Sequence, residues 1–218
     1  MLPSPMDVIR AFIKEFDVLI GHTLVSLKEA FLGLVASMAF AFIMAIVMDR
    51  YEVIYKSVYP LFIISQTIPV IAIAPLLVLW MGYGIAPKIF IIFLVCFFPL
   101  VIALLEGFKA ADRDTMRLME SMGATQNQIL YHIKFPCALG GLFAGLKVSV
   151  SYSIIGAVIA EWLGGNNGLG VYMTRVRKSY AFDKMFAVIL LISILSLLLM
   201  KGVSYLEKKV TPWNNIKN

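Results

Sequence analysis

Histidine and cysteine are the residue types best suited to chemistry in this sequence, and there are two of each. His22 and His132 lie in different segments with no motif spacing around either, so an enzyme is the weaker alternative for this chain. Cys96 and Cys137 lie in or beside apolar runs, without a CxxC partner or a nearby histidine pair. We interpret both cysteines as buried packing residues and expect no catalytic residue, no metal site and no cofactor.

A glycine-rich stretch that follows Glu161 is the other candidate for chemistry. It lacks the Lys-Ser/Thr of a nucleotide-binding loop and does not lie between a strand and a helix, so we reject a phosphate site. The glycines permit tight turns in a loop over residues 163–184, which we expect on the extracytoplasmic side. Three basic residues there could complement an acidic partner surface, or could equally face solvent or lipid headgroups. The residues concerned are Gly164, Gly165, Gly168, Gly170, Arg175, Arg177 and Lys178.

The composition requires a lipid solvent for most of the chain. Of 218 residues, 61% are hydrophobic and 15% are charged, and the mean hydropathy is +0.88. A soluble domain is nearer half apolar and a quarter charged. The net charge of +6 resides in short segments between long apolar runs, which indicates membrane topology and argues against a nucleic-acid partner.

Five segments are long and apolar enough to cross a bilayer, at about 20 residues each. Five crossings place the chain ends on opposite sides. Residues 1–23 are amphipathic and are expected on the membrane surface or against the spans. The sequence therefore predicts an all-α polytopic membrane bundle that forms one domain over residues 1–218. The expected spans are residues 24–48, 58–80, 89–108, 138–162 and 185–205.

The second span is interrupted by proline. Pro60, Pro69 and Pro75 remove amide donors, and Gln66 and Thr67 can satisfy carbonyls freed before Pro69. Broken helices at membrane depth are tolerated where protein or a watery cavity surrounds them. Two interpretations remain open, an ordinary kink buried in the bundle and a lining of a solute pathway.

Small residues recur at every fourth position in the first and fourth spans, which lets helix backbones approach closely. We expect these two helices to pack against each other or across a dimer axis. The fourth span also carries Lys147, expected to reach the cytoplasmic headgroups, and Glu161, a candidate for contact with solute or binding protein. The stripes comprise Gly33, Ser37, Ala41 and Ala45, and Gly141, Gly145, Ser149, Ser153 and Ala157.

The longest polar interruption, residues 109–136, has the pattern of a docking element. Asp112 or Asp114 can cap a first short helix that Gly123 ends, and Thr125, with glutamine three residues later, can cap a second. Each helix carries an apolar face. We expect this segment in the cytoplasm, and the slight excess of Lys and Arg on that side supports the orientation.

A further pattern closes this segment: glycine, nine residues, isoleucine, one residue, an apolar residue and proline. It is present as Gly123, Ile133, Phe135 and Pro136. The pattern resembles the cytoplasmic loop signature of permease subunits of binding-protein-dependent ABC importers. In that family the loop forms the coupling helix that contacts the ATPase. The chain departs from the family at residues 117–119, where Arg-Leu-Met replaces Glu-Ala-Ala, so the detail of that contact is expected to differ.

Other stretches resemble the nitrate, sulfonate and taurine branch of these permeases, and the resemblance covers essentially the whole chain. They are LPSP near the start, QTIPVIAIAPLLVLWMGYG at residues 66–84, the phenylalanines before Pro99, and AEWLGGNNGLG at residues 160–170. Within that branch, the stretch from GLGVYM through KSYAFDKMFAVI resembles permeases for thiamine-precursor pyrimidines more than sulfonate permeases.

The resemblance implies a type I importer permease with the MetI-like fold in the inner (plasma) membrane. Its expected partners are an ABC ATPase subunit that hydrolyses the ATP, a solute-binding protein, a second permease copy and lipid. The alternative is a membrane scaffold or assembly protein that does not transport. A measurement of ATP-dependent uptake would distinguish it from a permease. The residues expected at the ATPase are Met119, Glu120, Met122, Gly123, Ala124, Thr125, Ile133 and Pro136. Those expected along the pathway are Gln66, Thr67, Pro69, Ser149, Ser151, Tyr152 and Glu161, and Gly141 and Gly145 are expected in helix packing.

Overall fold

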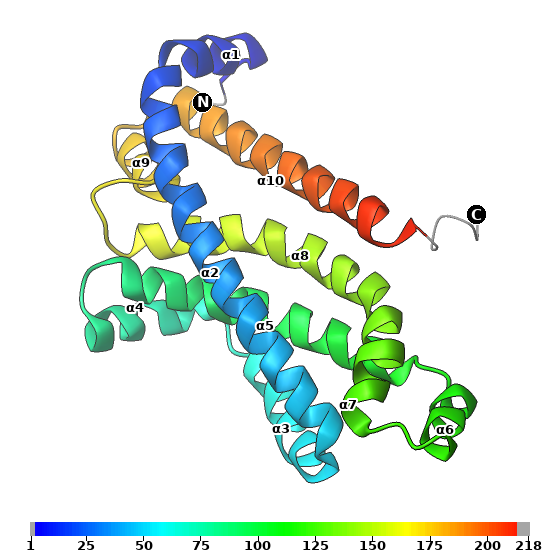
Figure 1. Cartoon of the computed structure of the whole chain (residues 1–218). Coiled ribbons are helices and arrows are strands. Elements are labelled where there is room, and N and C mark those ends of the chain that lie inside the picture. Colours follow the sequence, from blue (N-terminus) through cyan, green and yellow to red (C-terminus); the bar gives the residue numbers. More distant parts are fainter. Residues whose placement is uncertain (1–2, 213–218) are drawn as a thin grey trace.

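The computed structural model describes residues 3–212, and these residues form helices and no strand. The all-α prediction is confirmed, and Figure 1 shows long helices laid beside one another with short helices at their ends. The elements are α1 (Pro5–Lys14), α2 (Phe16–Arg50), α3 (Glu52–Gln66), α4 (Val70–Met81), α5 (Ile85–Lys109), α6 (Arg113–Ser121), α7 (Gln126–Ile129), the π-helix η1 (Leu130–Lys134), α8 (Phe135–Trp162), α9 (Leu169–Lys178) and α10 (Phe182–Val210).

Four continuous helical stretches are long and apolar enough to cross a membrane: α2, α5, α10 and the stretch Gln126–Trp162, which joins α7, η1 and α8. The pair α3 and α4 qualifies only together and is bent by 100°. At the start of the pair, Tyr55 accepts a hydrogen bond from Lys109, the last residue of α5. Just after the end of the pair, Tyr83 lies against Gly164, which follows α8. The broken pair therefore runs from one end of the bundle to the other and supplies the fifth crossing.

The bend falls at the three residues between α3 and α4, of which Pro69 is the last. Proline lacks an amide donor, so the helical ladder is interrupted there. The Thr67 hydroxyl donates to the carbonyl of Ile64 at 2.7 Å, and the Thr67 amide donates to the same carbonyl at 3.0 Å. Pro60 and Pro75 lie inside α3 and α4 without ending either helix.

Helix α5 is the centre of the packing. The small-residue stripe of α2 faces α5, because a Cβ at Gly33 would lie 2.4 Å from Ile92. The stripe of α8 also faces α5, since a Cβ at Gly145 would lie 2.7 Å from Ala103. The two stripes face α5 rather than each other, although α2 and α8 also meet where Ser26 donates to Glu161, and the expected packing across a dimer axis stays a prediction. Each stripe instead lets α5 approach closely, which gains contact where lipid supplies no hydrophobic drive.

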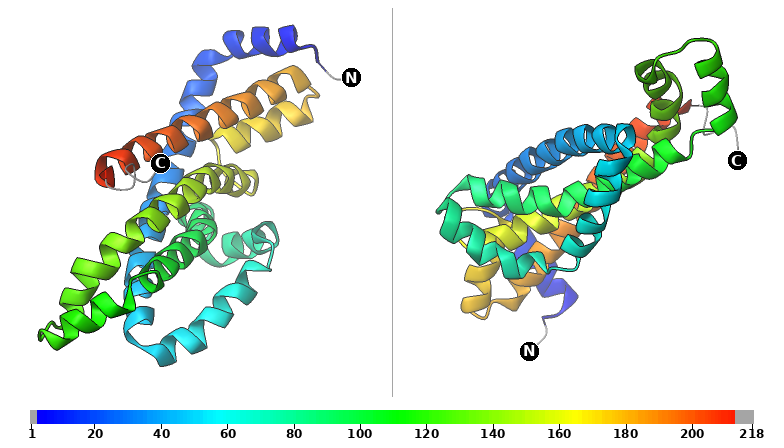
Figure 2. Two further views of the ribbon diagram at one scale, coloured as in Figure 1. Left: turned by 90° about the vertical axis from the view of Figure 1, so that its right-hand side faces the viewer. Right: turned by 90° about the horizontal axis from the view of Figure 1, so that it is seen from below.

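The amphipathic N-terminal helix is shorter than predicted. α1 ends at Lys14, and α2 begins at Phe16, so residues 16–23 are continuous with the helix of the first crossing; residues 1 and 2 lie outside the described range. Ser4 and Asp7 form a capping box at the start of α1. Glu15 accepts from Lys184 at 2.5 Å, which ties the α1–α2 corner to α10. Figure 2 shows α1 and α6 at opposite ends of the molecule in both views.

Candidate functional site

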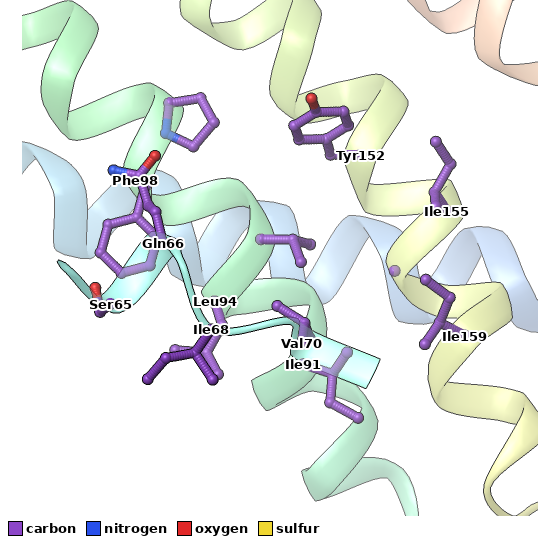
Figure 3. Close-up of a pocket in the computed structure, with 13 residues that line it drawn as sticks. Ser65, Gln66, Ile68, Val70, Ile91, Leu94, Phe98, Tyr152, Ile155 and Ile159 are labelled. Atoms are coloured by element: carbon purple, nitrogen blue, oxygen red, sulfur yellow. The ribbon is translucent and has the colours of Figure 1, made fainter. Parts of the chain in front are cut away.

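A cavity of about 310 Å³ opens beside the break between α3 and α4. Its walls come from the end of α3, the start of α4, the middle of α5 and the outer half of α8 (Figure 3). Gln66 and Tyr152 approach it from different walls. The lining residues are Ser65, Gln66, Ile68, Val70, Ile91, Leu94, Val95, Phe98, Pro99, Tyr152, Ile155, Gly156 and Ile159.

The lining is apolar except for a hydroxyl, an amide and a phenol, and no lining residue carries a charge. The polar groups are those of Ser65, Gln66 and Tyr152. Because an ion buried without a partner is strongly disfavoured, this lining suits a neutral guest that makes a few hydrogen bonds. Mostly apolar walls with few convergent polar groups are typical of small-molecule sites.

The structure brings together some of the predicted pathway residues and separates others. Gln66 and Tyr152 line the cavity, and Thr67 and Pro69 form the break at its edge. Ser149 is buried and donates to the Cys96 carbonyl at 3.1 Å, so it joins α8 to α5.

Two more predicted pathway residues point elsewhere. Ser151 lies 3.5 Å from the sulfur of Met200 and faces α10. Glu161 is buried among α2, α8 and the start of α9. These side chains serve helix contacts because a polar group in lipid first satisfies a neighbouring helix. Neither residue lines this cavity, and their expected place on the pathway stays a prediction.

Glu161 fastens the beginning of α9. Its carboxylate accepts from the hydroxyl of Ser26 at 2.6 Å and from the amide of Gly170 at 2.6 Å. The Ser26 oxygen accepts in turn from the amide of Leu169, and Nδ1 of His22 accepts from the amide of Gly168, both at 2.9 Å. A carboxylate is favourable at a helix N-terminus, where amide donors have no helical partner.

A buried ion pair lies near this cluster. Lys88 donates to Glu29 at 2.7 Å, and both side chains are almost fully buried. Sequence reasoning missed this pair, together with His22 and Ser26. Two charged residues inside or beside apolar runs could have indicated a buried ion pair. The sequence does not show, however, which helices contact each other.

Other charged and reactive residues are also placed by the structure. Lys147 pairs with Glu207 of α10 at 2.6 Å, a partner that the sequence did not reveal. Cys96 is buried as predicted, but Cys137 is exposed, so its interpretation as a buried residue is wrong. Arg175 donates to the carbonyl of Asn166 at 2.6 Å and braces the glycine loop. Within residues 3–212, no group of three His, Cys, Asp or Glu side chains is arranged to hold a metal.

The segment of residues 109–136 differs in one respect from its prediction. Asp112 caps α6 through the amide of Thr115 at 3.0 Å, and Thr125 and Gln128 cap each other reciprocally. Gly123 has φ of +83°, a left-handed turn that favours glycine. The second short helix is not separate, however. α7 has four residues and continues through η1 into α8, so it forms the inner end of the fourth crossing.

The surface of this segment exposes large apolar side chains. Leu118, Met122 and Tyr131 are 61%, 78% and 71% exposed, although they lie in a polar part of the chain. Exposed apolar groups gathered in such a surface mark an interaction site. Of the residues predicted to contact an ATPase, Glu120, Met122, Gly123 and Thr125 are exposed, and Met119, Ala124, Ile133 and Pro136 are half-buried.

A bundle of long apolar helices, one of them broken beside a cavity, defines a multi-pass membrane protein. The chain belongs to the family of binding-protein-dependent transport system inner membrane components, whose model matches residues 37–212. It is a multi-pass protein of a transport family and not of an enzyme family. The resemblance drawn from the sequence is therefore confirmed.

Relatives and a solved structure agree. The formylaminopyrimidine transport permease protein ThiX of Halalkalibacterium halodurans is 35% identical over 98% of this chain and 86% of its own length. The taurine transport system permease protein TauC of Escherichia coli is 30% identical over 88% of this chain and 70% of its own length. A chain from the crystal structure of an amino acid ABC transporter with histidines has a TM-score of 0.77 at 14% identity, with 96% of this chain and 100% of that chain covered, which shows the shared fold.

Proposed function

We propose that this permease imports a small, neutral, nitrogen-containing heterocycle of the pyrimidine class through the cavity at the α3–α4 break. A binding protein delivers the solute, and a separate ATPase subunit supplies the energy. The observation that carries the proposal is the lining of the cavity, which presents an amide and a phenol but no charge.

The side chains around the cavity match the chemistry of a pyrimidine. The amide of Gln66 offers both a donor and an acceptor, which pairs with the alternating ring nitrogens and exocyclic groups of such a ring. Phe98 and Tyr152 offer aromatic faces, and a volume of about 310 Å³ is near the lower end for small-molecule sites.

The relatives are named for different solutes, some neutral and some ionic. The chemistry of the cavity lining favours one of these two solute classes. Taurine carries a sulfonate, which would require a basic side chain or several donors aimed at it. The cavity offers neither among its lining residues. ThiX is a formylaminopyrimidine permease by name, and its similarity to this chain supports the same solute class here.

The partners follow from exposed surfaces. We propose that the ATPase binds residues 109–136, where Leu118, Met122 and Tyr131 are exposed. We also propose a homodimer in which a second copy covers the open side of the cavity beside Ile68 and Ile155, both of which are exposed. Lipid covers the remaining apolar faces of the spans.

Uptake into proteoliposomes tests the solute class. The permease is reconstituted with its ATPase and binding protein, and ATP-dependent uptake of formylaminopyrimidine is compared with that of taurine. Wild type is expected to take up the pyrimidine only. Gln66→Ala should lower its uptake about tenfold, the equivalent of one or two lost hydrogen bonds.

Ser151→Ala is the matched control, because Ser151 neighbours Tyr152 in sequence but faces α10. It should transport like wild type. Equal uptake by Gln66→Ala and wild type would remove the cavity from the pathway, and ATP-driven uptake of taurine in place of the pyrimidine would overturn the solute class.

A further inference from the structure

Residues 109–136, the proposed docking segment, contact the end of α2, which is distant from them in sequence. Lys134, the last residue of η1, donates to both carboxylate oxygens of Asp49 on α2, at 2.9 and 2.8 Å. The Arg50 guanidinium donates to Asn127 of α7 at 3.0 Å. These two contacts join the inner end of the fourth crossing to the corner where α2 meets α3.

The other end of the segment is held at the same corner. The ammonium of Lys109, the last residue of α5, bonds the hydroxyl of Tyr55 on α3 and lies 4.0 Å from the centroid of its ring. Tyr55 stacks on Tyr59 one turn further along α3. Both ends of the docking segment therefore contact the α2–α3 corner.

The Asp49–Lys134 pair is a largely buried ion pair that joins two different helices. Asp49 lies in the last turn of α2, where the helix dipole disfavours a carboxylate, and the ammonium of Lys134 offsets that cost. The two side chains are only 18% and 17% exposed, so water screens their attraction less than that of a surface pair. Removing one partner would leave a poorly solvated charge and loosen the contact.

The π-helix adds a place where this contact can change. η1 replaces one turn of the ordinary helical ladder between α7 and α8, and π turns within helices occur often at functional sites. Lys134 ends that turn, so a change in its winding would move the ammonium relative to Asp49. The corner would then follow the docking segment only while the ion pair is intact.

From the corner a single helix leads to the cavity. α3 runs from Glu52 to Gln66, about 22 Å at 1.5 Å per residue, and its last residues line the cavity wall. Displacement of the corner would therefore move Ser65 and Gln66 directly. α8 supplies a different wall of the cavity, at Tyr152.

We propose that the Asp49–Lys134 ion pair, assisted by Arg50 and Asn127, is a coupling clamp that transmits movement of the ATPase-bound segment through α3 to the cavity wall. The inference rests on the proposed function. Asp49 and Lys134 are positioning residues and touch neither ATP nor solute. Docking of the ATPase is assigned to the exposed side chains of Leu118, Met122 and Tyr131, whereas Lys134 is only 17% exposed and is assigned to coupling.

Reconstituted transporter tests the clamp with three readouts: ATPase subunit retained on purification, ATP hydrolysis stimulated by loaded binding protein, and solute uptake. Asp49→Asn and Lys134→Met should retain the ATPase and hydrolyse ATP, while uptake per ATP falls about tenfold, a coupling free energy of about 1.4 kcal/mol. The exchanged pair, Asp49→Lys with Lys134→Asp, should recover most of that ratio.

Lys56→Met is the matched control, because Lys56 pairs with Glu52 at the same corner while both are largely exposed, and such pairs contribute little. It should keep the wild-type ratio. The clamp would be overturned if Asp49→Asn took up as much solute per ATP as wild type. It would also be overturned if Asp49→Asn lost both the bound ATPase and uptake. Should Asp49→Asn fail to fold, Lys134→Met alone and Arg50→Ala decide by the same ratio. Failure of wild type to transport any solute would instead overturn the proposed function.

Discussion

Gly168 and Glu161 show how single residues set the outer end of the bundle. A Cβ at Gly168 would lie 2.1 Å from the carboxyl carbon of Glu161, and the backbone there has φ of +124°. Only glycine combines that conformation with so close an approach. The same carboxylate holds the amide of Gly170, so the start of α9 depends on it.

Gly168→Ala should therefore destabilise the protein by at least about 2 kcal/mol, because backbone strain adds to displacement of a buried carboxylate. Thermal unfolding in detergent measures the effect. Gly21→Ala is the control, since nothing lies within 4 Å of a Cβ there and the residue is helical. Matching melting temperatures for the two variants would contradict the role given to Gly168.

At the scale of elements, α6 depends on its cap. The side-chain hydroxyl and the amide of Thr115 both donate to Asp112, and they hold the pKa of that carboxyl below its ordinary value. Because the pKa is lower in the folded state, the cap contributes fully above the ordinary pKa of an aspartate. It is lost as the pH falls through the lowered value.

Hydrogen exchange of the first amides of α6 checks this cap. Wild type and Asp112→Asn should be equally protected at about pH 7, since both residue types cap helices, and only wild type should lose protection toward about pH 3. Asp112→Ala should lack the protection at both pH values. A wild-type helix as protected at the acidic pH as at neutral pH would refute the cap.

The helices of the crossings were largely predictable, and their contacts were not. Apolar runs of the right length predict α5 and α10 because lipid imposes that length on any spanning helix. The proline at residue 69 indicated a disturbed helix, but a kink and a 100° break have the same sequence signal. The small-residue stripes predicted close packing, yet spacing along one helix cannot name its neighbour, which proved to be α5.

The candidate site shows the same division. Gln66 and Tyr152 were predictable as polar residues at membrane depth, and both line the cavity. Ser149 and Ser151 have the same polarity but turn to other helices, because their positions on α8 point them elsewhere. The Asp49–Lys134 pair joins residues 85 positions apart, a contact that only the fold reveals.

At the scale of the whole molecule, the five crossings put α1 and α9 at one end and the docking segment at the other. In the proposed function the solute enters at the first of these ends and the ATPase acts at the other, about a membrane thickness away. All five crossings connect these ends, and three of them, α5, α8 and the broken pair, line the cavity. Import driven by a cytoplasmic ATPase therefore requires that residues 109–136 face the cytoplasm.

Labelling of a cysteine at Met122 tests that requirement most directly. Met122 is 78% exposed, and a Cys137→Ser background removes the one exposed native thiol of the described residues, while Cys96 is buried. An impermeant thiol reagent should label Met122→Cys in inside-out vesicles but not in intact cells, and the bound ATPase should block the labelling. Labelling in intact cells would contradict the cytoplasmic orientation, because no cytoplasmic motor could reach the segment.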